Sequence, residues 1–495
     1  MVYYEAYPPL RGSSPAALLR RASGIKLSAI HLAAGAVLAG GFLLSPQSAE
    51  ALPSFASQTG QPCSTCHIGA FGPQLTPFGR AFKLGGYTQQ GGDGLASKIP
   101  LSAMLLGSFS SSGGKVPDGT QPQHYGTNNN FAMDQISVFL AGRVTDYLGG
   151  FVQGTFNGIS STLKLDNTDL RLTTPFDVKD TELRVGLDVN NGPTVQDPFN
   201  STFAWGYPYV ASAFMAVPQA QPILTGAMIG NTIGVTGYAW YDKSLYLEAG
   251  GYSSYGPTAL SMAGTAYPGN PLGGTSGIAP YLRAAYEWNW NEQSAHIGTL
   301  FLYSDFNPET GDKARSVDTT FGRNNYTDIA IDGGYQYLGD GTHVGSLYGI
   351  YVHENQNLNG AYAAGGSSQA SNSLNQIRLN ASYFYQQTYG LTVAWQKTWG
   401  NQNMALYGGT DPTTGLPAPV TGSLNGKPNS NAFIVEADWI PFGKSESWMG
   451  PWANLKLGAQ YTIYTEFNGA SQNYDGNGRN ASANNMLYLF AWIAF

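Results

Sequence analysis

The chain contains two cysteines, Cys63 and Cys66, and His67 follows the second one directly in "QPCSTCHIG". This spacing is the attachment pattern of a c-type haem: two thiols bond to the haem vinyl groups, and the adjacent imidazole ligates the iron. The alternative is a thiol redox pair or a metal site. However, a zinc site needs four ligands, and no second Cys/His cluster lies nearby. The motif therefore predicts one covalently attached haem c, with His67 as the iron ligand.

The N-terminus has the features of an export signal. Arg20, Arg21 and Lys26 precede the apolar stretch "LSAIHLAAGAVLAGGFLL", and Ala49-Glu50-Ala51 offers a cleavage site. A retained helical anchor is the alternative, but the stretch is interrupted by glycines and a cleavage site follows it. We expect residues 1–51 to be a signal peptide cleaved near Ala51, residues 52–98 to form the haem segment, and residues 99–495 to form a second domain.

The composition indicates a β protein whose surface does not face only water. Charged residues make up 11% of the chain, well below the roughly 25% of an ordinary soluble domain. Aromatic residues reach 13%, and there are 64 glycines and 31 tyrosines. No apolar run long enough for a transmembrane helix follows residue 52. The net charge of −7 gives no sign of a nucleic-acid partner.

From residue 99 onward, the chain repeats segments of about ten residues in which apolar and polar side chains alternate. In the last of them, "NNMLYLFAWIAF", Leu487, Leu489, Ala491 and Ile493 share one face before the terminal Phe495. Elsewhere charged residues occupy the opposite face, which is the pattern of a barrel in lipid. Sixteen such strands are predicted, near 99–111, 131–144, 147–160, 163–173, 180–189, 231–241, 244–253, 278–290, 293–305, 326–338, 342–353, 373–387, 389–399, 431–441, 452–466 and 484–495.

The connections between these strands support an outer-membrane β-barrel. Short ones such as "VTDY", "DK" and "LGDGT" alternate with long ones rich in Gly, Asn, Ser and Pro. Transmembrane barrels have tight periplasmic turns and long outside loops. The long connections are expected near 112–130, 190–230, 254–277, 306–325, 354–372, 400–430 and 467–483. A soluble β-helix would show a fixed short repeat instead, and none is found.

The haem segment, 52–98, is too short to bury a haem well by itself, and it has no second iron ligand between Ile68 and Ala103. Both deficits predict that this small, helical or irregular segment docks in the barrel lumen. Met104, Met133 and His124 are the candidate distal ligands, although each is more often a packing or loop residue. A haem held in the tube would shorten the electron steps across a hydrocarbon layer of about 30 Å.

Three stretches carry a resemblance to a known family: "LPSFASQTGQPCSTCH", "LTPFGRAFKLGGY" and "NNGPTVQDPFNSTFAWGYPY". They resemble the fused cytochrome–porin outer-membrane iron oxidases of iron-oxidising bacteria. The resemblance implies oxidation of extracellular Fe(II), with the electron passing through the haem to a periplasmic cytochrome c or copper protein. Cys63, Cys66 and His67 match the family motif, whereas no iron-binding or catalytic residue can be matched. Two alternatives remain: a solute porin with a haem-bearing plug, and a conduit for another external donor or acceptor.

Charged residues on the inward phase offer a second set of candidates. Glu436 with Asp438, or Asp328 with Asp332, could contact Fe(II), a hard cation that favours oxygen ligands. Paired charges are also ordinary in barrel lumens, and we favour that interpretation. The remaining inward charges are Arg143, Asp169, Arg171, Glu182, Arg184, Asp188, Arg283, Glu287, Arg378 and Lys456. His296, His343 and His353 are expected to be structural or loop residues.

The low charge content also predicts the working pH. Exposed carboxylates are protonated in strongly acidic medium, whereas Lys and Arg remain charged and repel one another. A surface of Asn, Gln, Ser, Thr and Gly avoids this problem. We therefore hypothesise that the protein works in acid.

Overall fold

The computed structural model describes residues 53–226, 228, 232–254, 275, 277–306, 321–409, 417–447 and 453–495. The predicted signal peptide, residues 1–51, lies outside these ranges. All described residues belong to one compact unit, Ser48–Phe495. None of the helices in the described ranges is long and apolar enough to cross a membrane.

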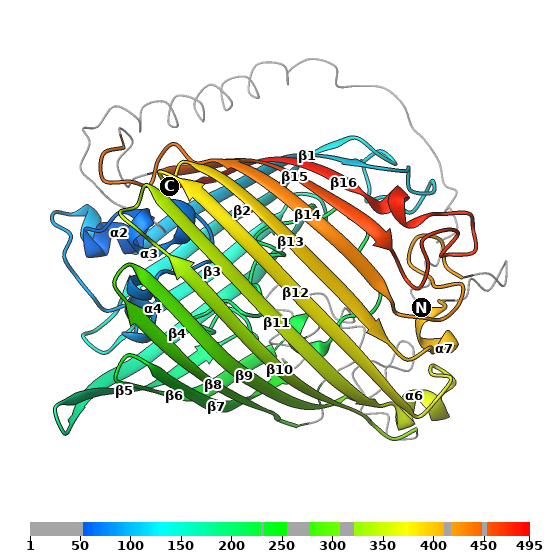
Figure 1. Cartoon of the computed structure of the whole chain (residues 1–495), viewed down its shortest axis with the longest axis horizontal. Helices are drawn as coiled ribbons and strands as arrows, with labels where there is room; N and C mark the ends of the chain where they lie inside the picture. The colour runs from blue at the N-terminus through cyan, green and yellow to red at the C-terminus, as the bar shows by residue number, and fades with distance from the viewer. Residues whose placement is uncertain are drawn as a thin grey trace, which may run out of the picture. The chain divides into compact units, whose positions relative to one another are not determined.

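Sixteen antiparallel strands form one closed barrel, in which each strand pairs with its neighbours in the chain and β1 pairs with β16 (Figure 1). The closing register places Met104 opposite Ala494. The number and order of strands confirm the prediction. The bounds are β1 Leu101–Ser112, β2 Asn130–Arg143, β3 Leu148–Asn157, β4 Thr162–Val178, β5 Thr181–Asn190, β6 Thr232–Tyr241, β7 Leu245–Ser254, β8 Ala279–Trp290, β9 Gln293–Phe306, β10 Asn324–Tyr337, β11 His343–Asn357, β12 Ser371–Tyr385, β13 Tyr389–Gly400, β14 Ser430–Trp439, β15 Asn454–Glu466 and β16 Met486–Ala494.

Strand β4 departs most from the prediction, because it continues to Val178 instead of ending near residue 173. The extension contains Pro175, which lacks the N–H that a central strand needs. Pairing with β3 ends at Leu172, so the last residues of β4 pair with β5 alone. Proline is tolerated there because this part of β4 has no partner strand on the β3 side, so the missing N–H removes no ladder hydrogen bond on that side. The turn then needs only Lys179 and Asp180, both with positive φ.

Two faces alternate along the strands as the sequence predicts. In β14, Phe433, Val435 and Trp439 are exposed on the outside, whereas Glu436 and Asp438 are buried on the inside. The same phase holds in β16. The outer face is therefore apolar and the lumen polar, the reverse of a water-soluble barrel.

One end of the barrel carries the short turns at 144–147, 179–180, 242–244, 291–292, 338–342 and 386–388; we call it the short-turn end. The opposite, long-loop end carries helices α6 (Asn359–Ala363), α7 (Met404–Tyr407) and η6 (Ala481–Asn484).

The N-terminal segment is short and helical, as expected. Its elements are α2 (Pro53–Thr59), α3 (Cys63–Cys66), η2 (Ile68–Ala70), α4 (Pro77–Leu84) and η3 (Ala96–Lys98). Figure 1 shows α2, α3 and α4 gathered at the barrel end where β16 finishes. Contacts with Phe384, near a short turn, and with Trp492 of β16 place the segment at the short-turn end.

The connection between β5 and β6 is the main difference from the predicted loop arrangement. It was expected among the loops outside the barrel, but residues 191–226 lie against inward-facing side chains of the wall. The Ile223 N–H donates to Glu354 and the Leu224 N–H donates to Asp328, each at 2.6 Å. The Tyr207 hydroxyl donates to the backbone carbonyl of Trp395 at 2.8 Å. We call residues 191–226 the lumen loop; it contains η4 (Ile223–Thr225).

Candidate haem centre

The C-x-x-C-H motif is held in one turn of helix and a loop that folds back on it. The His67 N–H donates to the Cys63 carbonyl at 2.8 Å, which closes the turn. The Thr76 N–H donates to the Cys66 carbonyl at 2.9 Å, so the end of the loop returns to the motif. This local network sets the backbone of both cysteines and the histidine.

Helix α4 packs directly on this motif. Thr76 caps the helix by accepting a hydrogen bond from the Gly79 N–H at 3.2 Å, and Pro77 occupies the first turn, where its missing N–H costs nothing. A Cβ at Gly79 would lie 2.3 Å from the Cys66 carbonyl oxygen. Only glycine allows this close approach of the two backbones.

A largely apolar cavity lies between the segment, the lumen loop and the wall. Its empty space, part of which opens to solvent, is about 1040 Å³. Aromatic side chains dominate its lining: Phe55, Phe71, Phe82, Tyr87, Phe139, Phe151, Trp205 and Trp492.

The structure brings several of the predicted site residues to this cavity. Cys66, His67 and Met104 all line it. Cys63 lies in a neighbouring buried cluster that shares Phe71 with the cavity. Of the other two candidate distal ligands, Met133 is 42% exposed on the outside of the barrel and His124 is exposed in the loop after β1. Met104 alone of the three faces the cavity.

Three polar atoms on the cavity wall are buried and form no hydrogen bond with described residues. They are Nδ1 of His67 and the indole Nε1 atoms of Trp205 and Trp492. Burial lowers the pKa of His67 to about 4, although a hydrogen bond with the Gly72 backbone opposes this shift. Burial thus favours the neutral imidazole, the form that ligates metals. An apolar cavity with a neutral imidazole and unused N–H donors fits a haem.

Buried polar contacts attach the segment to the wall. The Arg80 guanidinium is ion-paired with Glu287 of β8 at 2.6 Å and donates to the Leu75 carbonyl at 2.7 Å. The Tyr87 hydroxyl donates to Asp169 of β4 at 2.7 Å. Burial alone would lower the pKa of Arg80, but Glu287 and Tyr348 together more than offset this effect, so the net shift is upward. Arg80 and Tyr87 were not singled out from the sequence, because only the fold brings them to the wall.

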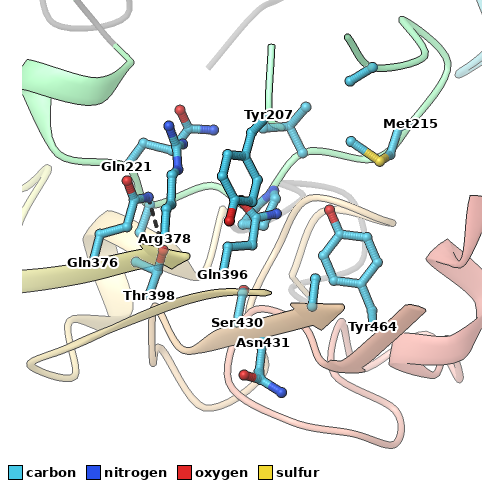
Figure 2. Close-up of a pocket in the computed structure, with 15 residues that line it drawn as sticks. Tyr207, Met215, Gln221, Gln376, Arg378, Gln396, Thr398, Ser430, Asn431 and Tyr464 are labelled. Atoms are coloured by element: carbon cyan, nitrogen blue, oxygen red, sulfur yellow. Dashed lines mark hydrogen bonds between the residues drawn. The ribbon is translucent and has the colours of Figure 1, made fainter. Parts of the chain in front are cut away.

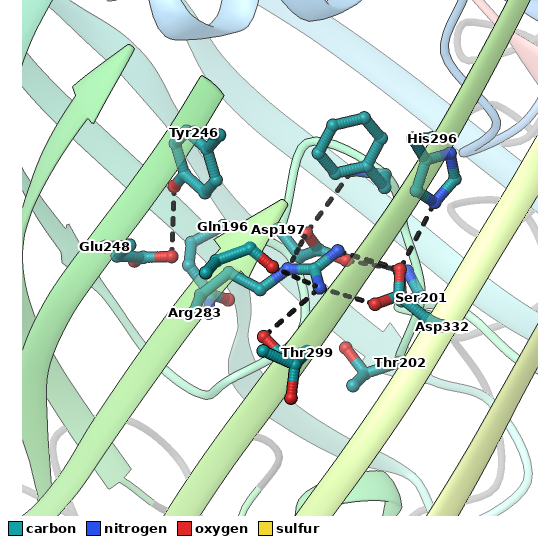
Figure 3. A network of polar contacts seen from close by, with 12 residues as sticks. Gln196, Asp197, Ser201, Thr202, Tyr246, Glu248, Arg283, His296, Thr299 and Asp332 are labelled. Atoms are coloured by element: carbon teal, nitrogen blue, oxygen red, sulfur yellow. Dashed lines mark hydrogen bonds and ion pairs between the residues drawn. The ribbon is translucent and has the colours of Figure 1, made fainter. Parts of the chain in front are cut away.

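Most of the inward carboxylates that could contact Fe(II) are already paired with basic side chains. Lys456 contacts Glu436 at 2.7 Å and Asp438 at 3.1 Å. Arg283 contacts Asp332 at 2.5 Å, and in Figure 3 both belong to a network with the lumen loop. Within the described ranges, no group of three or more His, Cys, Asp or Glu side chains could hold a metal ion. The interpretation of ordinary paired lumen charges is therefore favoured.

The predicted structural histidines have ordinary partners. His296 contacts Asp332 at 3.2 Å and stacks on Phe199 of the lumen loop (Figure 3). His343 and His353 are hydrogen-bonded to Tyr383 and Asn375 of the adjacent strand. None of the three lines the haem cavity.

Comparison with known proteins finds similarity only among solved barrel structures. No protein-family model and no curated protein matches the chain. OmpT, an outer membrane protein of Vibrio cholerae, is 10% identical with a TM-score of 0.41, covering 80% of this chain and 98% of its own. Pseudomonas putida OprB is 10% identical with a TM-score of 0.43 and coverage of 80% and 94%.

The outer membrane channel DcaP of Acinetobacter baumannii is 11% identical with a TM-score of 0.41, covering 80% of this chain and 96% of its own. These likenesses are weak, and nothing about function follows from them. The fold assignment rests on the strand order and register: a closed antiparallel barrel of sixteen strands, the strand number of the smaller porins.

Proposed function

We propose that the chain is an outer-membrane electron conduit. It takes an electron from extracellular Fe(II) and passes it, through one covalently bound haem c, to a periplasmic cytochrome c or copper protein. The observation that carries the proposal is the meeting of Cys66, His67 and Met104 at one apolar cavity at the short-turn end of the barrel.

The outer face of the barrel supports a membrane location. Leu140 is 61% exposed, Ile331 57% and Leu391 51%. Exposing apolar side chains to water costs about 25 cal/mol per Å² of apolar surface. In a membrane barrel, lipid covers this surface instead. Exposed aromatic residues gather near the short turns, as in the girdles at lipid–water boundaries: Tyr241, Tyr286, Trp288, Trp290, Tyr335, Tyr337, Tyr383, Tyr385, Tyr389 and Trp439.

The residues that would hold the haem have distinct tasks. Cys63 and Cys66 would form the two thioether bonds, and His67 and Met104 would ligate the iron. The indole N–H groups of Trp205 and Trp492 are available to the propionate carboxylates. When bound, the haem supplies a one-electron Fe(III)/Fe(II) couple. The aromatic wall would limit the access of water to the haem, which would favour the reduced, less charged state and raise the potential.

The lumen loop and the N-terminal segment together favour a conduit over an open porin. Both occupy the space inside the wall, and both are attached through buried hydrogen bonds and ion pairs. Oxidation of Fe(II) to Fe(III) releases one electron, and the periplasmic carrier accepts it. Electron transfer of this kind needs no inner-sphere iron site, which agrees with the paired state of Glu436 and Asp438.

The test uses haem-loaded protein in liposomes that enclose an oxidised soluble cytochrome c. Fe(II) is added outside at about pH 3, where exposed carboxylates are largely protonated, and the spectra of both haems are recorded. We expect the protein haem to be reduced within seconds and the enclosed cytochrome to follow. The His67→Ala variant should lose both steps. If the wild-type haem stays oxidised after Fe(II) is added, the proposal is wrong.

A conductance measurement separates the conduit from a haem-bearing solute porin. In planar bilayers, the filled lumen should pass little ion current. Large, steady channel currents from the haem-loaded wild-type protein would favour the porin.

A further inference from the structure

A second cavity lies in the lumen, away from the haem cavity and lined by different residues. Its empty space, which includes some open solvent, is about 630 Å³. The lumen loop forms one side, and the inner faces of β12, β13, β14 and β15 form the other (Figure 2). Its lining includes Arg378 but neither an aspartate nor a glutamate. A positive charge therefore faces this cavity with no countercharge in its wall.

Arg378 differs from the other buried arginines in the described part of the chain. Arg80, Arg171 and Arg283 each contact a carboxylate within 2.5 to 2.8 Å. Arg378 is only 7% exposed, its Nε is buried without an acceptor, and its guanidinium contacts no carboxylate among the described residues. A buried charge without a partner is strongly unfavourable unless a bound ligand supplies the opposite charge.

The surroundings hold the guanidinium in place but leave its donors unused. The Tyr207 ring lies beside it, with the guanidinium carbon 5.4 Å from the ring centroid. The Tyr207 hydroxyl donates to backbone carbonyls of Leu379 and Trp395, which fixes the ring. This contact stabilises a cation but accepts none of its N–H groups.

Neutral amide donors surround the arginine. Figure 2 shows Gln221 of the lumen loop beside Arg378. Gln376 lies on β12, the strand that carries Arg378, and Gln396 lies on β13. Gln376 is hydrogen-bonded to Thr398 at 3.2 Å and accepts from Thr225 at 2.9 Å. The side-chain amides of Gln221 and Gln396 form no hydrogen bond with any residue in the described ranges, so their N–H groups are free to donate to a ligand.

We infer that this cavity binds a small tetrahedral oxyanion, sulfate or inorganic phosphate. The guanidinium fork matches two oxygens of such an ion, and the amides of Gln221 and Gln396 can donate to the others. Arg378 remains charged at every working pH, so binding does not depend on its titration. The inference rests on neither the haem nor Fe(II).

The experiment is equilibrium dialysis of the full-length protein in detergent with radiolabelled sulfate or phosphate, at constant chloride and ionic strength. The variants are Arg378→Gln, Arg378→Lys and, as a control, Lys397→Gln. Lys397 lies on β13 next to Gln396 but on the opposite face, with its ammonium 5.8 Å from the Trp399 ring centroid. The control removes the same charge without touching the cavity.

We expect one saturable site per chain in the wild type, at least tenfold weaker binding in Arg378→Gln, and no change in Lys397→Gln. Arg378→Lys should also bind more weakly, because it keeps the charge but loses the fork; this variant serves if Arg378→Gln does not fold. The inference is overturned if the wild type binds neither anion, if both arginine variants bind normally, or if Lys397→Gln weakens binding as much as Arg378→Gln.

Discussion

Arg80 of helix α4 and Glu287 of strand β8 form a buried ion pair, with Nη2 of Arg80 2.6 Å from Oε1 of Glu287. Both residues are at most 3% exposed, although 207 positions separate them in the chain. Arg80 also donates to Ser294 at 2.9 Å, so one side chain connects the haem segment with two neighbouring strands. This contact is one of several that attach the N-terminal segment to the wall, together with the bond from Tyr87 to Asp169.

The Glu287→Gln variant should release the haem segment. It leaves the Arg80 charge buried without its partner, a loss of about 3–5 kcal/mol when one member of a buried pair is removed. The segment should then be cleaved faster in limited proteolysis, while the barrel remains intact. Glu292→Gln, on an exposed turn residue, is the control. Equal cleavage rates for Glu287→Gln and the wild type would contradict the role given to this pair.

Met104 is expected to be the second protein ligand of the haem iron, besides His67. Met104→Leu keeps the apolar volume but removes the thioether sulfur. The far-red band typical of methionine-ligated ferric haem should disappear, and the midpoint potential should fall because an axial methionine raises it. Met133→Leu is the matched control, since Met133 faces outward. A spectrum that Met104→Leu leaves unchanged would exclude Met104 as the ligand.

Gly79→Ala should impair the haem site although alanine is the better helix former by about 1 kcal/mol. The new methyl group would lie 2.3 Å from the Cys66 carbonyl oxygen, and overpacking of this kind costs about 1–3 kcal/mol. Haem stain per chain, measured on denaturing gels, should fall. Gly154→Ala is the control, because no atom lies within 4 Å of its added Cβ. Equal haem loading in the two variants would contradict the close packing of α4 on the motif.

The strands could be predicted from the sequence because alternation of apolar and polar residues is a local pattern, whereas the haem motif remains a prediction. Alternation along a strand fixes which residues face inward, so Met104, Glu436 and Asp438 were placed correctly. Errors occurred at strand ends: β11 continues to Asn357, four residues beyond the prediction, and so adds Glu354 to the inner wall. The end of β4 was predicted too early in the same way, because Pro175 is not expected inside a strand.

The course of the lumen loop could not be predicted, because its partners are far away in the chain. The Tyr207 hydroxyl reaches carbonyls on β12 and β13, more than 170 positions later. Local sequence gives the length and polarity of a loop but not the side of the wall on which it lies. For the same reason, the choice of Met104 over Met133 and His124 needed the three-dimensional arrangement.

Iron oxidation should persist in acid if the low charge content is an adaptation to it. Initial rates of haem reduction by Fe(II) should remain high at about pH 3, where exposed carboxylates are largely neutral. Stopped-flow spectroscopy across the pH range measures this directly, with dithionite reduction at each pH as a control for haem integrity. An optimum at neutrality, with loss of activity below about pH 4 while dithionite still reduces the haem, would refute the adaptation.

Asp328 is expected to keep the lumen closed, because its carboxylate accepts the hydrogen bond from the Leu224 N–H at 2.6 Å. The Asp328→Leu variant leaves that buried N–H without an acceptor, which costs about 1–3 kcal/mol. The anchored end of the lumen loop should therefore detach more often. A destabilisation of about 1.4 kcal/mol corresponds to a tenfold change in an equilibrium constant, so channel openings in planar bilayers should become about tenfold more frequent. Asp340→Leu, on an exposed short turn, should conduct no more than the wild type. If Asp328→Leu stays as closed as the wild type, other contacts of the loop are sufficient to hold it, and this hydrogen bond is not what keeps the lumen closed.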